Sequence, residues 1–354
     1  MFGLLSVGFV STQIEGVESM SDEEREMIEA RQKFFGKQYV DENTGKISPD
    51  QVIFSWVGVS NFAVAINGRV ILLDAWIPGG EESNYIPATP DELAALQPEA
   101  IFIGHAHFDH VNHAAEIIEK SGATLIGTSG HCEQVKKEAE KEEAINCIEA
   151  IQKDASPGSV QKLKFLEGVK ITAISHVHSA IKLPDINDDL SPLFPKKDRA
   201  SDAPKGDMKK LLASIGEDEG GAIMYQFQVG DFTFTWNDSA GPIKEEAPDL
   251  TGILASLSET DVQLGAIMGF NQYTNGLRDP RMYIEALKPK VFVPTHHDNW
   301  SPPITTTAGN YRDALEKELD NLSGSIPELI FLADPDDYVK PERLTFNILD
   351  EKWQ

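Results

Sequence analysis

The chain has 354 residues, of which 41% are hydrophobic and 25% are charged, as in a globular protein with a sizeable core. Its 57 acidic and 31 basic residues give a formal net charge of −26, which argues against binding to nucleic acid and adhesion to anionic membranes, because both need a basic face. No apolar run approaches the roughly 18 residues of a membrane span, so we expect no stable membrane insertion. A surface this acidic is equally typical of adaptation to a salty medium.

The N-terminal stretch MFGLLSVGFVSTQIEGVES has a short apolar run but neither a basic segment nor an Ala-x-Ala cleavage site. This favours a cytoplasmic location, with export after trimming of a signal peptide as the alternative. Cys132 and Cys147 lie fifteen residues apart, which allows a disulfide without requiring one.

The residues Ser21 and Glu24 form the pattern of a capping box, in which each side chain accepts a hydrogen bond from a free backbone N–H. The pattern predicts a helix over residues 22–35, and its many charges predict a surface position. We expect residues 1–48 to form an N-terminal helical extension and residues 49–354 to form one domain.

Three apolar runs then predict strands: VIFSWVG, NFAVAING and RVILLDAW, which begin at Val52. Asn67-Gly68 between the last two runs predicts a tight hairpin. Thr89 and Glu92 around Pro90 predict the start of a helix that ends before Pro98.

The segment IFIGHAHFDHVNHAAEI, residues 101–117, carries four potential metal ligands directly after a predicted buried strand. A polar loop is the plainer interpretation, but four of the nine histidines of the chain lie in this one segment. His105 and His107, two residues apart, can point the same way from an extended turn, whereas the neighbours Asp109 and His110 point elsewhere. Two pairs aimed in two directions suit two adjacent metal ions better than one.

The sequence HAHFDH resembles the HxHxDH signature of the metallo-β-lactamase superfamily of binuclear metal hydrolases. The resemblance covers about residues 52–300 and implies an α/β (α+β) fold, the αββα four-layer sandwich, with the metals at one edge. The run WVGVSNFAVAINGRVILLDAW resembles the branch that contains ascorbate-6-phosphate lactonases and N-acyl-phosphatidylethanolamine phospholipases D. Members of that branch often have Gly-His where this chain has Gly58-Val59, and Asp-Pro where it has Asp74-Ala75. The resemblance implies that Asp74 supports the metal loop and does not bind metal.

After the motif we expect an amphipathic helix that ends at Gly122, a strand ATLIGTS, and a long charged helix from about Cys132 to Lys153 with a solvated face. His131 starts that helix, and we assign it no chemistry. The Pro- and Asp-rich residues 180–220 predict an insertion without regular core structure, placed to act as a lid or pocket wall.

In the second half, two paired strands around Glu167-Gly168 lead to His176 and His178. The superfamily completes its first metal site with a histidine after this strand, and the resemblance implies His178 in that position. His176 stays a competitor, because a spacing of two puts it on the same side of an extended chain. We otherwise expect His176 to support the site or to face the substrate.

Two further strand ends complete the resemblance. A hairpin around Gly230-Asp231 ends in Asp238, the position where the superfamily has a carboxylate that bridges both metals, although Asn237 replaces the usual Gly. A strand over KVFVPTHHDNW ends in His296, which the resemblance makes a ligand; His297 and Asp298 become candidates for substrate contact or proton transfer. LGAIMGF predicts a buried strand, NQYTNG a pocket loop, PRMYIEALKP a helix, and ELIFL and RLTFNIL edge strands.

The resemblance therefore implies one metal on His105, His107 and His178, a second on Asp109, His110 and His296, and Asp238 between them. Three histidines with an open position suit zinc, and manganese or iron stays an alternative. The candidate catalytic residues are Asp109, His176 and His297.

We expect a metal-dependent hydrolase in which a hydroxide bridging two metal ions attacks an ester-type bond of a small molecule, with a lactone first because of the branch resemblance. A phosphodiesterase or phospholipase-D-like hydrolase is the alternative. A mononuclear-iron persulfide dioxygenase, which shares HxHxDH, is the alternative of another class. The sequence leaves open whether the chain forms a homo-oligomer.

Overall fold

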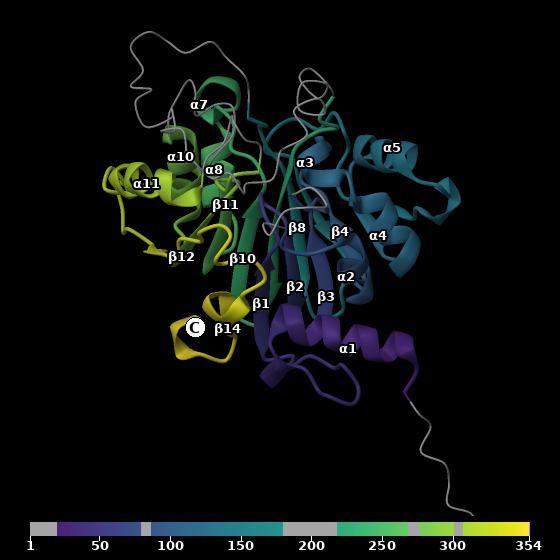
Figure 1. Cartoon of the computed structure of the whole chain (residues 1–354). Helices are drawn as coiled ribbons and strands as arrows, with labels where there is room; N and C mark the ends of the chain where they lie inside the picture. Colours follow the sequence, from purple (N-terminus) through teal and green to yellow (C-terminus); the bar gives the residue numbers. More distant parts are fainter. Residues whose placement is uncertain (1–19, 79–85, 180–217, 268–276, 301–306, 354) are drawn as a thin grey trace, which may run out of the picture.

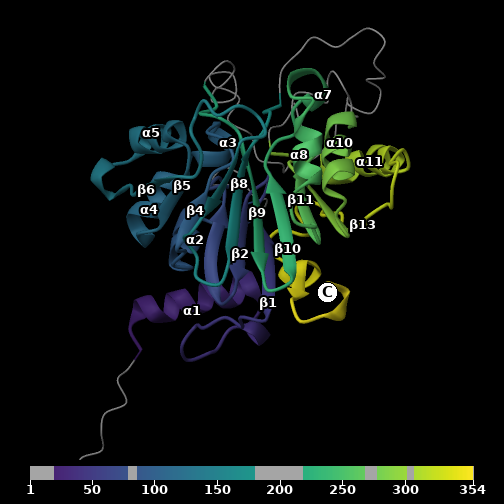
Figure 2. The same cartoon turned by 180° about the vertical axis from the view of Figure 1, so that it is seen from behind.

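Two sheets of seven strands lie face to face, with helices on both outer faces (Figures 1 and 2). This computed structural model describes residues 20–78, 86–179, 218–267, 277–300 and 307–353. The arrangement confirms the predicted αββα sandwich. No helix in the described part of the chain has the length and apolar character needed to cross a membrane.

The first sheet has the strand order β14-β1-β2-β3-β4-β5-β6 and the second the order β13-β12-β11-β10-β9-β8-β7. The bounds of the first seven strands are β1 Gln51–Trp56, β2 Phe62–Ile66, β3 Arg69–Leu73, β4 Ala100–Phe102, β5 Thr124–Gly127, β6 Cys147–Glu149 and β14 Thr345–Asn347. Those of the second sheet are β7 Val160–Leu163, β8 Lys170–Ser175, β9 Ile223–Val229, β10 Phe232–Asn237, β11 Val262–Ala266, β12 Val291–Thr295 and β13 Glu328–Leu329. The predicted edge strands β13 and β14 are confirmed.

The helices that the structure describes cover the two sheets separately (Figures 1 and 2). The first sheet carries α1 Asp22–Phe35, α2 Pro90–Ala95, α3 Phe108–Val111, α4 Ala114–Ser121 and α5 Ser129–Glu138. The second carries α7 Ile243–Glu246, α8 Leu250–Ala255, α10 Arg278–Leu287 and α11 Arg312–Leu319. Single turns of 3-10 helix lie at Lys37–Tyr39, Glu142–Ala144, Ala308–Tyr311, Pro341–Leu344 and Glu351–Trp353.

Aromatic side chains fill the space between the sheets. Phe54 of the first sheet meets Phe234 of the second edge to face, with ring centroids 4.8 Å apart, and Phe102 meets Phe227 in the same way at 5.0 Å. All four rings are fully buried. Each stabilises the fold by about 1.5–3 kcal/mol relative to an exposed ring, so this layer fixes how the sheets lie on each other.

The predicted hairpins form where the turn residues permit them. Asn67 and Gly68 join β2 to β3, and both have positive φ, 50° and 73°, as a two-residue turn between twisted strands requires. Gly230 and Asp231 form a two-residue turn between β9 and β10, in which Gly230 has the positive φ, 57°. The second hairpin delivers Asp238 to the edge of its sheet.

The N-terminal helix α1 begins with the predicted capping box, in which Ser21 Oγ accepts the Glu24 N–H at 3.1 Å. Its charged face is exposed, but Phe34 and Phe35 are fully buried against the first sheet. Arg31 donates hydrogen bonds to backbone carbonyls of that layer. The helix therefore belongs to the core of the first layer, and the boundary at residue 48 stays a prediction.

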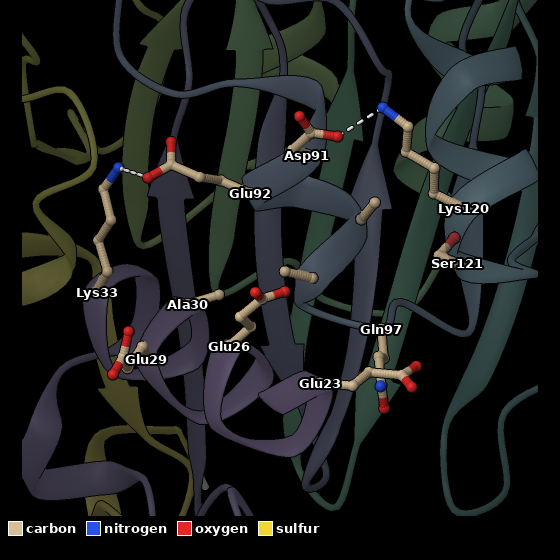
Figure 3. A pocket seen from close by; sticks show the side chains of 12 residues that line it. Glu23, Glu26, Glu29, Ala30, Lys33, Asp91, Glu92, Gln97, Lys120 and Ser121 are labelled. Carbon is tan, nitrogen blue, oxygen red and sulfur yellow. Dashed lines mark hydrogen bonds and ion pairs between the residues drawn. The ribbon is translucent and has the colours of Figure 1, made fainter. Parts of the chain in front are cut away.

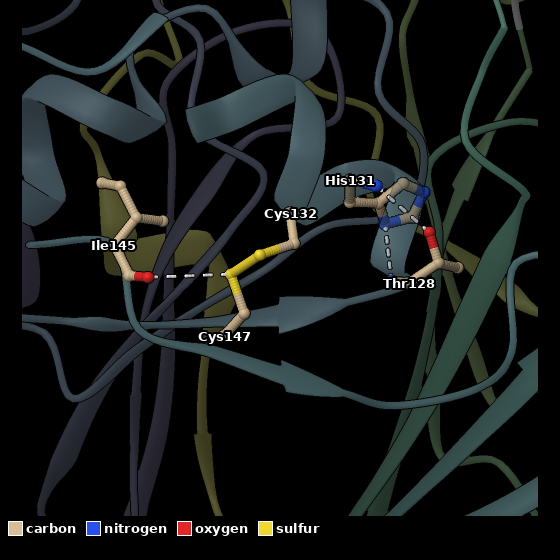
Figure 4. Close-up of a disulfide and its surroundings, with 5 residues drawn as sticks. All are labelled: Thr128, His131, Cys132, Ile145 and Cys147. Carbon is tan, nitrogen blue, oxygen red and sulfur yellow. Dashed lines mark hydrogen bonds between the residues drawn. A yellow bond between two sulfur atoms is a disulfide. The ribbon is translucent and has the colours of Figure 1, made fainter. Parts of the chain in front are cut away.

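The predicted long helix from Cys132 to Lys153 is wrong. Helix α5 ends at Glu138, a turn of 3-10 helix follows, and the chain then enters β6 at the edge of the first sheet. Cys132 and Cys147 form a disulfide that joins α5 to β6 (Figure 4). Charges at spacings of three and four allow a solvated helix, but pairing with β5 and the covalent link decide the conformation here.

The disulfide closes a loop with a sequence separation of 15 residues, and a cross-link of this length limits the unfolded chain. We expect Cys132→Ser with Cys147→Ser to lower the free energy of unfolding by about 3 kcal/mol. Urea unfolding of both proteins, with and without dithiothreitol, measures the difference. Reductant should affect only the parent protein, and equal stability of the two under oxidising conditions would contradict the expectation.

Candidate metal site

Strand ends from both sheets meet at one edge of the sandwich, where α3 lies (Figure 1). The first sheet contributes Asp74 directly after β3 and the 105–110 segment after β4. The second sheet contributes His178 after β8, Asp238 after β10 and His296 after β12. Because each side chain follows a strand held in a ladder, the sheets fix the positions of groups that are far apart in the sequence.

Three groups of side chains could each hold a metal ion. Within each group, the nitrogen and oxygen atoms that could bind it lie within 4.8 Å of one another. The groups are His105, His107 and His178; Asp109, His110 and His296; and His105, His110 and Asp238. The first two are the two ligand sets expected from the sequence. The third joins one histidine of each set to Asp238, so that the carboxylate lies between them.

Asp238 is the contact between the two sheets at this site. Its Oδ2 lies 2.6 Å from His105 Nδ1 and 3.4 Å from His110 Nδ1. A side chain at Gly104 would place a Cβ 2.1 Å from the same carboxylate. The position next to His105 therefore has to be glycine if Asp238 is to reach both rings.

Asp74 orients His110 from behind. Its Oδ2 lies 2.6 Å from His110 Nδ1 and accepts the Ser60 hydroxyl at 2.9 Å, while Oδ1 accepts the Gly104 N–H at 3.1 Å. The ring therefore presents Nε2 toward Asp109, which is 3.5 Å away. A carboxylate that holds the far nitrogen of a histidine in this way fixes the tautomer and orientation of a metal ligand.

The electrostatics of the two histidine sets differ. Burial lowers the pKa of His105, His107 and His178, that of His178 to about 3, so these rings are neutral at pH 7. Burial alone would lower the pKa of His110 as well, but the carboxylates of Asp109 and Asp74 outweigh burial and raise this pKa to about 9. The second set thus combines a cationic ring with carboxylates until a metal ion replaces the proton.

The residues fit divalent metal ions. Among the described residues, several buried atoms at the site have no hydrogen-bond partner: His110 Nε2, Asp238 Oδ1 and His296 Nδ1. Buried polar atoms rarely remain without partners. Imidazole nitrogens with carboxylate oxygens are the donor set of zinc, manganese and iron.

Two expected catalytic residues lie outside the three groups. His176 is buried, with Nδ1 3.1 Å from the Tyr283 hydroxyl. His297 is fully buried between the rings of Trp56 and Phe331, and its Nε2 lies 2.9 Å from the Leu332 carbonyl. The structure does not bring His297 to the cluster, because neighbouring side chains at a strand end point in opposite directions.

Asp298, a sequence candidate for substrate contact or proton transfer, holds loops together in the structure. Asp298 accepts the Val59 N–H at 3.1 Å and the Tyr338 hydroxyl at 2.5 Å, and so braces two loops. Val59, at φ 52°, and His296, at φ 61°, hold conformations that few side chains adopt, and the His296 N–H donates to the Val59 carbonyl.

The predicted insertion lies almost wholly outside the described residues, as does the NQYTNG loop. Their expected contribution to a pocket stays a prediction. Another hollow, of about 780 Å³, lies between α1, α2 and α4 (Figure 3). It is lined by acidic side chains and by two lysines that are already paired, to Glu92 and Asp91, and no residue of the three groups lines it.

Known proteins share parts of this sequence and its fold. A model of the metallo-beta-lactamase superfamily matches residues 55–164. The UPF0173 metal-dependent hydrolase of Pyrobaculum neutrophilum is 40% identical over 74 residues, which span 21% of this chain but only 31% of that relative. The UPF0173 metal-dependent hydrolase of Methanopyrus kandleri is 22% identical over 263 residues, 74% of this chain and 91% of the relative. Igni18, a metallo hydrolase from Ignicoccus hospitalis, has the same fold, with a TM-score of 0.51 at 16% identity over 80% of this chain and 95% of that one.

We expect Asp74→Asn to weaken metal binding by about 10–100-fold, because the amide cannot hold His110 as the carboxylate does. Competition with a chelator measures the affinity. Asp261→Asn is a matched control: Asp261 is also a buried carboxylate that accepts a backbone N–H, but it lies at the start of β11, away from the site. Unchanged affinity in a folded Asp74→Asn protein would show that Asp74 does not orient a ligand.

Proposed function

Because the chain belongs to the metallo-β-lactamase superfamily, we propose that it is a metal-dependent hydrolase that binds two divalent cations and cleaves an ester-type bond of a small molecule, most naturally a lactone. The observation that carries the proposal is the pair of ligand sets joined through Asp238. The names of the relatives, metal-dependent hydrolases, agree with it.

Two divalent cations bound at such a site would polarise a substrate oxygen and lower the pKa of water toward roughly 7. The neutral rings of His105, His107 and His178 would hold one cation without having to lose a proton first. The other set would lose the His110 proton when it binds its cation. Asp238 Oδ2 contacts Nδ1 of one ring in each set, and its Oδ1, which has no hydrogen-bond partner among the described residues, would be free to face the cations.

Asp109 has a second role in this proposal. Burial acts against its charge, but His110 and His296 outweigh burial and hold the pKa of the Asp109 carboxyl below its usual range. The carboxylate lies 3.3 Å from His296 Nε2 and 3.5 Å from His110 Nε2. An ionised carboxylate at this position can accept a hydrogen bond from the attacking water and orient it.

Lactones lead among the ester-type substrates because the strands around Asn67 resemble the branch with ascorbate-6-phosphate lactonases. The same branch contains phospholipases D, so a phosphodiester is the second candidate. A small lactone and bis(p-nitrophenyl) phosphate separate the two, because only the second releases a phosphate ester.

We expect His107→Ala and Asp109→Ala to lower turnover of the preferred substrate by at least about a thousandfold, since loss of a metal ligand removes several kcal/mol of transition-state stabilisation. Steady-state hydrolysis and circular dichroism measure activity and folding. His113→Ala is the control, because His113 lies in the same segment but in none of the three groups. Full activity in either ligand variant would overturn the site assignment.

We expect about two zinc or manganese ions per chain, and chelation should abolish hydrolysis until metal is returned. A metal that binds only the folded state raises the free energy of unfolding by about 4 kcal/mol when its concentration is a thousandfold above its Kd. Chelation should therefore also lower the Tm. Elemental analysis, activity and thermal unfolding on one preparation measure all three. Iron with oxygen consumption on glutathione persulfide would instead indicate the dioxygenase.

A further inference from the structure

A short segment that leads into β9, residues 219–223, lies against the loop of the first ligand set, and we call it the supporting segment. Its first carbonyl, that of Glu219, accepts the Ala106 N–H at 2.8 Å. Its last N–H donates to the Gly104 carbonyl, also at 2.8 Å. These two hydrogen bonds hold the residues on either side of His105. The place of the supporting segment therefore sets where this proposed ligand lies.

The N-terminal end of α5 holds the supporting segment from the other side. The Thr128 hydroxyl donates to the Gly220 carbonyl at 2.5 Å, and Nε2 of His131 lies 2.8 Å from the Gly221 carbonyl. Both side chains are buried. Two consecutive carbonyls are thus fixed between the two points where the segment meets the loop. The disulfide next to His131 joins α5 to β6, so the helix that bears these groups is itself anchored (Figure 4).

The hydrogen-bond partners of His131 fix which of its ring nitrogens carries the hydrogen. Nδ1 accepts the backbone N–H of Thr128 at 3.2 Å, so this nitrogen is unprotonated. The Gly221 carbonyl can only accept, so Nε2 donates to it. Burial lowers the pKa of His131 to about 4, which keeps the ring neutral, with a single hydrogen, at pH 7. Nδ1 therefore serves the helix cap, and Nε2–H serves the supporting segment.

Glycines bring the ring of His131 and the supporting segment into direct contact. A Cβ at Gly220 would lie 2.7 Å from Cδ2 of His131, and a Cβ at Gly127 would lie 2.6 Å from Nδ1. A Cβ at Gly130 would lie 2.8 Å from the Gly220 Cα. A side chain at any of these positions would force the ring or the segment to move. A helix cap alone does not require this packing, because the cap uses only Nδ1.

We propose that His131 is a positioning residue of the metal site: its Nε2–H holds the supporting segment against α5, and the segment holds the loop of His105 and His107 in the geometry that binds a cation. His131 touches neither metal nor substrate and acts through the backbone of the segment. Loss of a group that holds a metal ligand from behind lowers metal affinity by about 10–100-fold. The inference rests on the metal centre of the proposed function and adds to it a residue of α5.

Two variants separate the roles of the two ring nitrogens. In His131→Gln the amide N–H can reach the place of Nε2 and donate to Gly221. In His131→Asn the shorter amide can accept the Thr128 N–H but cannot reach Gly221. We expect His131→Asn to weaken the binding of one of two Co²⁺ ions by about tenfold, and His131→Gln to stay within about threefold of the parent protein. Titration with Co²⁺, followed by its visible absorption, measures both binding steps.

Ser21→Ala is the control for this titration. It removes the capping box of α1, at the opposite end of the sandwich, and should leave both Co²⁺ affinities unchanged (Figure 1). Parent-like affinity in His131→Asn, or an equal loss in His131→Gln, would overturn the inference.

Hydrogen exchange reads the same contact without metal. In His131→Asn the Ala106 and Ile223 amide hydrogens should exchange about tenfold faster than in the parent protein, because both hydrogen bonds join the loop to the loosened segment. The Asp261 amide, which donates to the Thr233 carbonyl elsewhere in the second sheet, should keep its rate. Unchanged exchange at Ala106 and Ile223, or equal acceleration at Asp261, would overturn the inference.

The two measurements keep this inference distinguishable from the proposed function. Weaker Co²⁺ binding by His131→Asn, beside a parent protein that hydrolyses no ester-type bond, would support the positioning role and reject the hydrolase. Hydrolysis by the parent protein, with unchanged affinity and exchange in His131→Asn, would overturn the positioning role and leave the hydrolase in place.

Discussion

The contact of Asp238 with His105 and His110 joins the two sheets at the edge where their strand ends carry the three groups of potential ligands. A buried carboxylate between two histidine sets is costly unless opposite charge compensates it. The surrounding architecture meets that demand with few residues: Gly104 gives the carboxylate room, and Asp74 holds His110 from the other side. Burial on this scale requires the whole sandwich, because a single sheet would leave the edge open to water.

The two ligand sets of the site consequently differ in charge. The three-histidine set is neutral because burial opposes protonation, whereas His110 is stabilised as a cation by the carboxylates around it.

Local signals in the sequence predicted the structure correctly wherever a few neighbouring residues decide the conformation. The capping boxes at Ser21 and Thr89 and the Asn67-Gly68 turn formed as predicted, since each depends on contacts within about four residues. The helix predicted from Cys132 to Lys153 was wrong because distant residues decide the conformation there. Its charges are compatible with a helix, and only the neighbouring strand β5 and the disulfide turn its second half into an edge strand.

What the sequence by itself determined is the chemistry available: four potential ligands in six residues, and further histidines and a carboxylate after predicted strands. The fold class followed from the resemblance of HAHFDH and of the strands around it to a known superfamily. Only the tertiary structure decided which polar groups share a site. It separated His178 from His176 and placed His297 between Trp56 and Phe331, because the direction of each side chain depends on how its strand end packs against the opposite sheet.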